Sequence, residues 1–217
     1  MPLKNIAIFG AGGFGLEVAM LIQQINAVSP TWNIHGFFDD GIPPGTRVND
    51  WEVLGGVDEL NSHQKSLAVA FALGMSNVRE AVVHRLNNPV LYFPTLIHPS
   101  VILGSPDYVE IGEGGIICAN TIITTNICIG RFAILNLACT VGHETVIGDY
   151  CSFMPTCNIS GEVTIGNVSF WGTGAKVINR CTVGGATTIG AGAVIVSDIP
   201  DHATAVGVPA KVIKTRQ

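Results

Sequence analysis

Every sixth residue from Ile111 to Ile195 is aliphatic or aromatic, and the phase of this repeat never slips. The repeated positions are Ile111, Ile117, Ile123, Ile129, Leu135, Val141, Ile147, Phe153, Ile159, Ile165, Trp171, Val177, Val183, Ile189 and Ile195. Glycine follows the apolar residue in many of these hexads, and the side chain four positions after it is usually small. A six-residue period fits neither an α-helix nor the simple alternation of a single strand, whereas it is a known signature of parallel β-helices.

The hexad has a direct physical meaning if each one forms a short strand and a corner. About three hexads then close one triangular coil, and one apolar side chain per hexad points to the axis, where it stacks on its equivalents in neighbouring coils. Glycine and small residues allow the backbone to turn at each corner without a clash of Cβ. A β-sandwich of short strands is the alternative, but sandwiches do not hold one phase over so many repeats. The sequence therefore predicts a parallel β-helix for this part of the chain.

The composition is compatible with two modest domains in a chain of 217 residues. Hydrophobic residues make up 47% of the chain and charged residues 12%, which suits an axis lined with Ile and Val. The net charge of −5 and the lack of a basic stretch argue against nucleic acid as a partner. The sequence has no apolar run long enough to span a membrane and no signal-peptide pattern, so we expect a cytoplasmic protein.

The six cysteines raise the question of disulfides or a metal site. Four of them occupy the small-residue position of the hexad, namely Cys139, Cys151, Cys157 and Cys181. Cys118 and Cys128 lie elsewhere in the hexad, and no CxxC pair occurs. We therefore predict free, structural thiols and no metal site, which fits a reducing cytoplasm.

The first 95 residues begin with a strand, a glycine turn and a helix. Residues 4–9 are predicted to form the strand, residues 10–15 read GAGGFG, and residues 16–25 have helical periodicity. Such a turn lets a phosphate approach the backbone closely, and the helix N-terminus offers free N–H groups to an anion. A phosphate-bearing ligand is therefore one interpretation of this turn.

Further elements complete a Rossmann-like unit. Strands are predicted at 34–38, 67–73 and 90–93, with a helix at 77–86, and the first of these strands ends at Asp39 and Asp40, placed to meet a ribose or base. Only residues 1–95 precede the repeats, which is room for one mononucleotide-binding half. We therefore favour a mononucleotide-type ligand over NAD, and a tight turn without ligand is the third interpretation. The second domain is expected to span residues 96–217, with His98 as a structural residue of the junction.

Three polar side chains interrupt the apolar repeat. They are Asn136, His143 and Glu144. An imidazole can accept a proton near neutral pH, and a neighbouring carboxylate can orient it and raise its basicity. The alternative interpretation is a solvated His–Glu pair at a corner of the coil.

Several short motifs appear in a fixed order along nearly the whole chain. They read GAGGFG at 10–15, FFDD at 37–40, LGG at 54–56, LIHPS at 96–100, VGHE at 141–144, IGD at 147–149 and VGVPAK at 206–211. Together they resemble the sugar acyltransferases of the PglD/NeuD type, which act in bacterial glycan biosynthesis. The resemblance implies an N-terminal nucleotide-sugar-binding domain and a left-handed β-helix. It also implies a homotrimer with active sites between subunits, where acetyl-CoA is held between neighbouring β-helices.

The resemblance also assigns roles to residues that match the family motifs. His143 matches the general base, Glu144 its partner, and Asn136 an asparagine that helps to position the reacting groups. Gly161, one predicted coil beyond His143, matches a glycine whose backbone N–H faces the thioester carbonyl. The positions that match nucleotide-sugar contacts are Gly12, Gly13, Asp39 and Gly55 or Gly56, with Phe14 and Asp40 beside them. Thr173 and Ala191 match backbone positions that line the coenzyme A channel.

Two positions depart from the family pattern. Many relatives have a histidine that helps to bind acetyl-CoA where this chain has Ser152, and some have a polar residue in the glycine turn where it has Phe14. The first departure weakens or replaces a cosubstrate contact, and the second leaves the nucleotide and its pose open.

The expected reaction is direct acetyl transfer from acetyl-CoA to the amine of a nucleotide-linked (4-)amino sugar, without a metal and without an acyl-cysteine. The glycine turn favours this acceptor, because a free sialic acid or polysaccharide hydroxyl would leave the turn without an obvious role. O-acetylation of a glycan is the alternative activity, and a non-catalytic β-helix module is the alternative to an enzyme.

Overall fold

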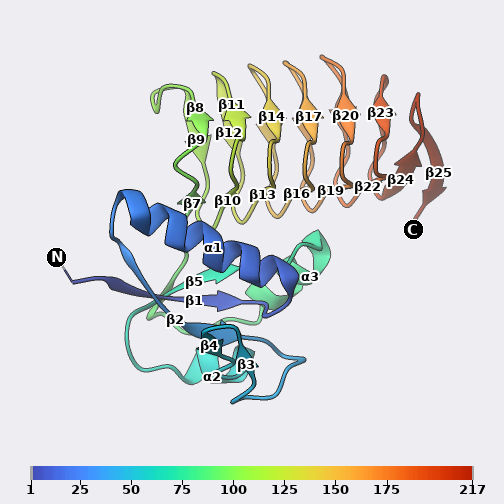
Figure 1. The fold of residues 1–217 in the computed structure, drawn as a ribbon. Coiled ribbons are helices and arrows are strands. Elements are labelled where there is room, and N and C mark those ends of the chain that lie inside the picture. The colour runs from blue at the N-terminus through green and yellow to red at the C-terminus, as the bar shows by residue number, and fades with distance from the viewer. Residues whose placement is uncertain (1, 217) are drawn as a thin grey trace.

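The computed structural model describes residues 2–216, with an α/β domain packed beneath a column of short parallel strands (Figure 1). The elements of the first domain are β1 (Lys4–Phe9), α1 (Gly13–Val28), β2 (Trp32–Phe38), β3 (Arg47–Val48), β4 (Trp51–Glu52), α2 (Val57–Ser62), β5 (Leu67–Phe71), α3 (Ser76–Val83) and β6 (Leu91–Tyr92). Strands β2, β1, β5 and β6 lie in this order in one parallel sheet. This arrangement confirms the predicted Rossmann-like unit.

The glycine turn is shaped by close packing between β1 and α1. A Cβ on Gly15 would lie 2.0 Å from the carbonyl oxygen of Gly10, so only glycine allows the helix to start so near the strand. The helix begins at Gly13, earlier than the periodicity predicted, because the last glycines of the turn form its first turn. Residues 41–66, for which no helix or strand is predicted from the sequence, form the hairpin β3–β4 and the short helix α2.

The second domain is a parallel β-helix built from three sheets. Its coil strands are β7 (Leu96–Ile97), β8 (Ile102–Leu103), β9 (Val109–Ile111), β10 (Ile116–Ile117), β11 (Ile122–Ile123), β12 (Ile127–Ile129), β13 (Ile134–Leu135), β14 (Thr140–Val141), β15 (Val146–Ile147), β16 (Ser152–Phe153), β17 (Asn158–Ile159), β18 (Thr164–Ile165), β19 (Phe170–Trp171), β20 (Lys176–Val177), β21 (Thr182–Val183), β22 (Thr188–Ile189) and β23 (Val194–Ile195). Paired residues are three hexads apart, as in Ile116 with Ile134. The antiparallel pair β24 (Ala203–Val206) and β25 (Lys211–Thr215) ends the column.

The hexad residues line the axis as predicted. All of them except Ile111 are buried, and the rings of Phe153 and Trp171 pack against each other in successive coils, tilted by 46° with centroids 5.4 Å apart. The role predicted for the glycines needs a correction. Left-handed backbone occurs two residues after the glycine, mostly at non-glycine residues such as Glu144 (φ 56°). The glycine itself gives close approach between coils, since a Cβ on Gly142 would lie 2.6 Å from the nitrogen of Gly161.

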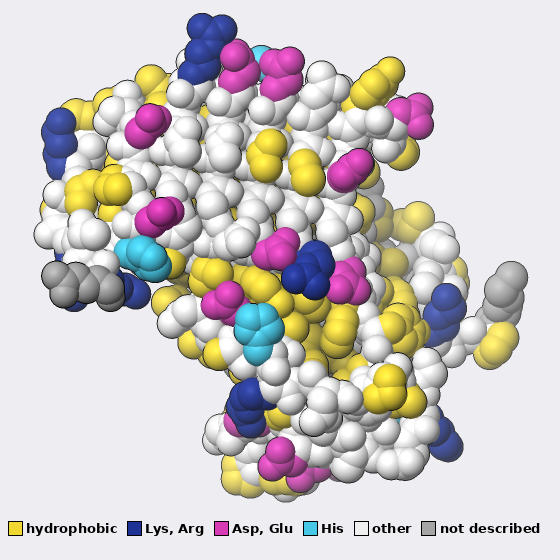
Figure 2. Space-filling view, turned by 180° about the vertical axis from the view of Figure 1, so that it is seen from behind, with side chains coloured by type: hydrophobic (Ala, Val, Ile, Leu, Met, Phe, Trp, Pro, Cys, Tyr) yellow, Lys and Arg dark blue, Asp and Glu magenta, His cyan; other side chains and the backbone are white. Residues whose placement is uncertain are grey.

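The two domains share their hydrophobic cores. The α1 residues Val18 and Ile22 belong to one cluster with Ile116 and Ile134 of the β-helix, and Phe71 belongs to another with Phe132. Figure 2 shows hydrophobic side chains gathered where the domains meet, on the face opposite to Figure 1. The N-terminal sheet and the β-helix therefore pack against each other through shared clusters, and the division near residue 95 stays a prediction.

The cysteines and the helices add two further observations. All six cysteines are free, and all except Cys128 are buried, in agreement with the hexad register of the four that occupy its small-residue position. Within residues 2–216, no helix is long and apolar enough to cross a membrane.

Candidate active site

His143 lies at an exposed corner of the β-helix, between β14 and β15. Its side chain is 57% exposed, and its Nδ1 lies 3.2 Å from Oε2 of Glu144. The left-handed backbone at Glu144 places the carboxylate beside the ring of the preceding residue. When Nδ1–H donates to this carboxylate, Nε2 carries the lone pair that can accept a proton.

The next coil places Gly161 directly against this imidazole. A Cβ on Gly161 would lie 2.5 Å from Nε2 and 2.6 Å from Cε1 of His143, so any larger residue would collide with the ring. The carbonyl oxygen of His143 accepts a hydrogen bond of 2.8 Å from the nitrogen of Glu162, which holds the two corners together. The structure therefore brings together His143, Glu144 and Gly161, as predicted.

The backbone N–H of Gly161 is a donor without a protein partner in the described chain. Two of the equivalent N–H groups at another edge of the coil donate to carboxylates, from Arg131 to Asp149 at 2.7 Å and from Gly185 to Asp201 at 2.6 Å. An N–H at this position of the corner can therefore reach an anionic oxygen. At Gly161 that oxygen can come from a ligand, and the lone pair of His143 lies beside it.

Asn136 lies on a different edge of the coil from His143. We call the row of corners that carries His143 and Gly161 the His143 edge, and the row that carries Asn136, Thr173 and Ala191 the Asn136 edge. Strand β14 separates the two edges, and Asn136 is 5% exposed with its Oδ1 accepting a hydrogen bond of 2.7 Å from Leu137 N. Asn136 and His143 therefore do not meet within one chain, and the positioning role expected for Asn136 stays a prediction.

Ser152 is enclosed between the domains. It lies on β16, its side chain is fully buried, and its hydroxyl has no hydrogen-bond partner in the described chain. A buried side chain does not line a surface that is open to a cosubstrate. The burial of Ser152 therefore argues against the expected contact of this position with acetyl-CoA, which binding measurements on a Ser152 variant would test.

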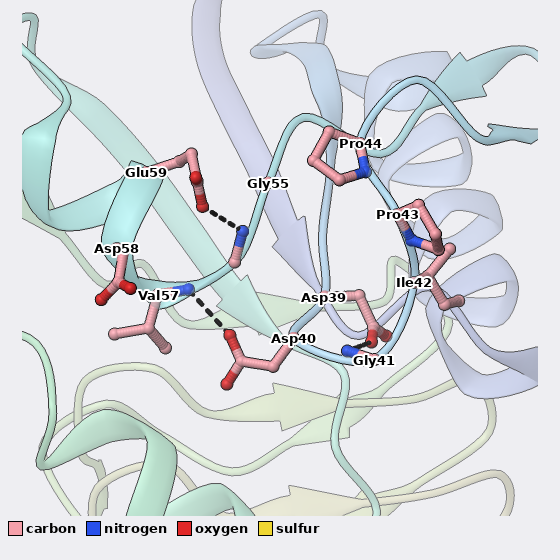
Figure 3. Close-up of a pocket in the computed structure, with 11 residues that line it drawn as sticks. Asp39, Asp40, Gly41, Ile42, Pro43, Pro44, Gly55, Val57, Asp58 and Glu59 are labelled. Carbon is pink, nitrogen blue, oxygen red and sulfur yellow. Dashed lines mark hydrogen bonds between the residues drawn. The ribbon is translucent and has the colours of Figure 1, made fainter.

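A cavity of about 370 Å³ opens at the carboxyl ends of the strands of the first domain (Figure 3). Its lining includes Asp39 and Asp40 after β2, and Gly55 and Gly56 before α2. Ligands of open α/β sheets bind at this edge. The cavity therefore unites four of the residues predicted to hold a nucleotide-sugar.

The carboxylates in this cavity shape the surrounding loops. Asp39 accepts hydrogen bonds from the nitrogens of Ala11 at 2.9 Å and Gly41 at 2.8 Å, so it ties the glycine turn to the end of β2. Asp40 accepts from Val57 N at 2.9 Å and forms an ion pair with Arg85 at 2.6 Å. Sequence reasoning missed Arg85, because no local motif links it to a carboxylate so far away in the chain.

The rest of the glycine turn lies beside this cavity. A Cβ on Gly12 or Gly13 would meet nothing within 4 Å, so both backbones face open space and a ligand can approach them. Phe14 is partly buried and packs against the cluster that joins α1 to the β-helix, so its side chain supports the turn.

Comparison with known proteins matches both domains. The model of the PglD N-terminal domain family matches residues 5–86. A perosamine N-acetyltransferase from Caulobacter crescentus, solved as a mutant in complex with CoA and GDP-perosamine, superposes with a TM-score of 0.85 at 30% identity, covering 98% of both chains. The chain belongs to the PglD-type family of sugar acetyltransferases. Its fold is thus the predicted Rossmann-like domain followed by a left-handed β-helix.

Two further relatives agree with this family. The acetyltransferase domain of PglB from Neisseria gonorrhoeae, solved with acetyl coenzyme A, has a TM-score of 0.85 at 31% identity, covering 98% of this chain and all of that one. The GDP-perosamine N-acetyltransferase of Escherichia coli is 33% identical over 153 residues, which span 68% of this chain and 66% of that protein. Within residues 2–216, no group of three or more His, Cys, Asp or Glu residues could hold a metal ion.

Proposed function

We propose that this PglD-type chain transfers the acetyl group of acetyl-CoA to the amine of a nucleotide-linked amino sugar. The contact of His143 with Gly161 carries the proposal, because it sets a proton acceptor beside a free backbone donor. The cavity at Asp39 and Asp40 supplies a place for the nucleotide. Relatives that act on GDP-perosamine support a GDP-linked 4-amino sugar as the first substrate to test.

The proposed chemistry is a direct transfer. The amine nitrogen attacks the thioester carbon, and Nε2 of His143 removes a proton from it. The N–H of Gly161 donates to the oxyanion of the tetrahedral intermediate, a contribution of roughly 3 kcal/mol for one such donor in other enzymes. When the tetrahedral intermediate collapses, the C–S bond breaks, and the proton held by His143 passes to the coenzyme A thiolate. Glu144 keeps the ring in the tautomer that this step requires.

The two edges of the coil support a site shared between copies. The edge that carries Asn136, Thr173 and Ala191 lies where the chain enters the sheet that contains β14. His143 lies on the edge where the chain leaves that sheet. A cyclic trimer places the Asn136 edge of one copy against the His143 edge of the next, and three such contacts close the ring. In this arrangement acetyl-CoA runs between neighbouring β-helices, along Thr173 and Ala191, towards the His143 of the other copy.

The test is release of coenzyme A from acetyl-CoA with GDP-, UDP- and dTDP-linked 4-amino sugars. We expect turnover with one nucleotide, and a fall in kcat by a factor on the order of 10² or more in His143→Ala. His202→Asn is the matched control, because His202 is exposed and its left-handed backbone suits asparagine.

Each other outcome rejects a defined part of the proposal. Normal turnover in His143→Ala rejects the general base. Binding of acetyl-CoA without turnover on any amine favours a hydroxyl acceptor. No binding and no turnover favour a non-catalytic module.

A further inference from the structure

Arg79 is a fully buried arginine on α3, and all its hydrogen bonds go to backbone carbonyls. Its Nε donates to Phe132 O at 2.9 Å, its Nη2 to Tyr150 O at 2.8 Å and Cys151 O at 3.1 Å, and its Nη1 to Leu73 O. No carboxylate in the described chain forms an ion pair with it. Burial lowers its pKa to about 10, so it stays a cation at neutral pH.

The acceptors of this guanidinium belong to two different parts of the molecule. Leu73 lies in the loop after β5, and this loop borders the glycine turn, since a Cβ on Gly10 would lie 2.7 Å from Ala72 O. Phe132 and Tyr150 lie at the same corner of two successive coils of the β-helix. One side chain therefore connects the edge of the first domain that carries the glycine turn, which we call the glycine-turn edge, to two coils of the second domain.

Further contacts around Arg79 make this connection between the two domains rigid. The rings of Phe132 and Tyr150 stack with centroids 5.3 Å apart, and Phe71 at the end of β5 meets Phe132 at 5.8 Å. The hydroxyl of Ser76 donates to Ser169 O at 3.0 Å, on a third coil. The planar guanidinium has donors in a fixed fork, so its four bonds specify one relative placement of the domains.

Packing alone does not require a charge at this place. A buried cation without a counter-ion is costly, and hydrophobic side chains of similar volume often stabilise a protein better than buried charges do. The arginine adds hydrogen bonds of fixed direction to carbonyls of both domains. Such bonds suit a function that depends on how the two domains are placed relative to each other.

We propose that Arg79 is a positioning residue, which holds the glycine-turn edge of the first domain at a fixed place on the β-helix so that the bound sugar meets the His143 corner of the neighbouring copy. The inference rests on the proposed function. In the proposed trimer the first domain of one copy binds the nucleotide and the β-helix of the next supplies His143, so the placement of the first domain on its own β-helix sets the reach of the sugar. A displacement of about 1 Å can lower the rate by about 10²-fold.

The experiment compares Arg79→Lys and Arg79→Met with the wild type and with Arg47→Lys, an exposed arginine of the same domain. Measured are kcat with the nucleotide-linked amino sugar, the Kd values of the nucleoside diphosphate and of acetyl-CoA, and Tm. A lysine keeps the charge but lacks the fork, so we expect kcat to fall about tenfold or more while both Kd values change by less than about threefold. The kcat of Arg79→Met should fall further, and the kcat of Arg47→Lys should equal that of the wild type.

Ser76→Ala keeps the inference testable if the arginine variants do not fold. It removes one hydrogen bond of the same interface between the domains without leaving a buried charge. We expect a kcat lower by about threefold with unchanged Kd values. An unchanged kcat in the folded variants, even with a lower Tm, overturns the positioning role. A Kd for the nucleotide that weakens in step with kcat also overturns it. A wild type that acetylates no nucleotide-linked amino sugar rejects the proposed function and this inference together.

Discussion

A methyl group on Gly161 would lie 2.5 Å from Nε2 of His143, so the imidazole occupies the space of the side chain that Gly161 lacks. In Gly161→Ala the ring must turn away from its place beside the free N–H. The His143 side chain is exposed and its ring can turn into solvent, so the fold should persist although Gly161 itself is buried under that ring. We expect kcat to fall about 10²-fold or more with Tm changed by only a few degrees.

Gly185→Ala is the matched control for this substitution. Gly185 occupies the equivalent corner position on another edge, and the nearest atom to its added Cβ would be Asn167 O at 3.1 Å. This variant should retain wild-type kcat. Equal activity in Gly161→Ala and Gly185→Ala would contradict the proposed pairing of base and donor.

Asp39→Asn should weaken nucleotide binding. Asp39 accepts from Ala11 N with one oxygen and from Gly41 N with the other, and an amide offers only one oxygen. The hydrogen bond that is lost was made to a charged group, worth about 1.5–3 kcal/mol. We expect the Kd of GDP to rise about tenfold or more in calorimetry, with the Kd of acetyl-CoA unchanged. Asp50→Asn, at an exposed turn, is the control, and a similar loss there would contradict the role of Asp39.

The period of the hexads explains which parts of the site could be predicted from the sequence. Residues three hexads apart stack in successive coils, so Gly161 could be placed on His143 by counting. Asn136 and His143 differ by seven positions, about one hexad, so the same count places them on neighbouring edges.

The contacts of Arg79 depend on packing that no local pattern carries. Its acceptors at Phe132 and Tyr150 lie 53 and 71 residues away, and they are backbone carbonyls, which every residue has. The sequence predicted α3, but not that this helix would bury a cation against the coil. The segment 41–66 was missed for a related reason, because its strands have only two residues each and show no alternation.

Ser152→Ala should leave cosubstrate binding intact. The serine hydroxyl is buried and unpaired, and such a group costs about 1–3 kcal/mol relative to an apolar one. We expect the free energy of unfolding to be unchanged or to rise by about 1 kcal/mol, and the Kd of acetyl-CoA to stay the same. Weaker acetyl-CoA binding in this variant would instead place position 152 at the coenzyme A site.

The buried thiols should make the folded chain sensitive to alkaline pH. Burial raises the pKa of Cys151 from 9.0 to about 12, and that of Cys118 likewise to about 12. Below about pH 9 these thiols are protonated in both states, whereas between about 9 and 12 only the unfolded chain releases the protons. Rising pH therefore favours unfolding, and each group lowers the free energy of unfolding by up to about 1.4 kcal/mol per pH unit in this window.

Urea denaturation between pH 8 and 10.5 measures this loss of stability. Cys151→Ala should be less stable at pH 8, because the alanine leaves a cavity, but its stability should fall less steeply with pH. Cys128→Ala is the control, since Cys128 is exposed and its removal should not change the slope. Parallel slopes for the wild type and Cys151→Ala would show that the alkaline loss comes from other groups, such as Tyr150, whose pKa burial also raises.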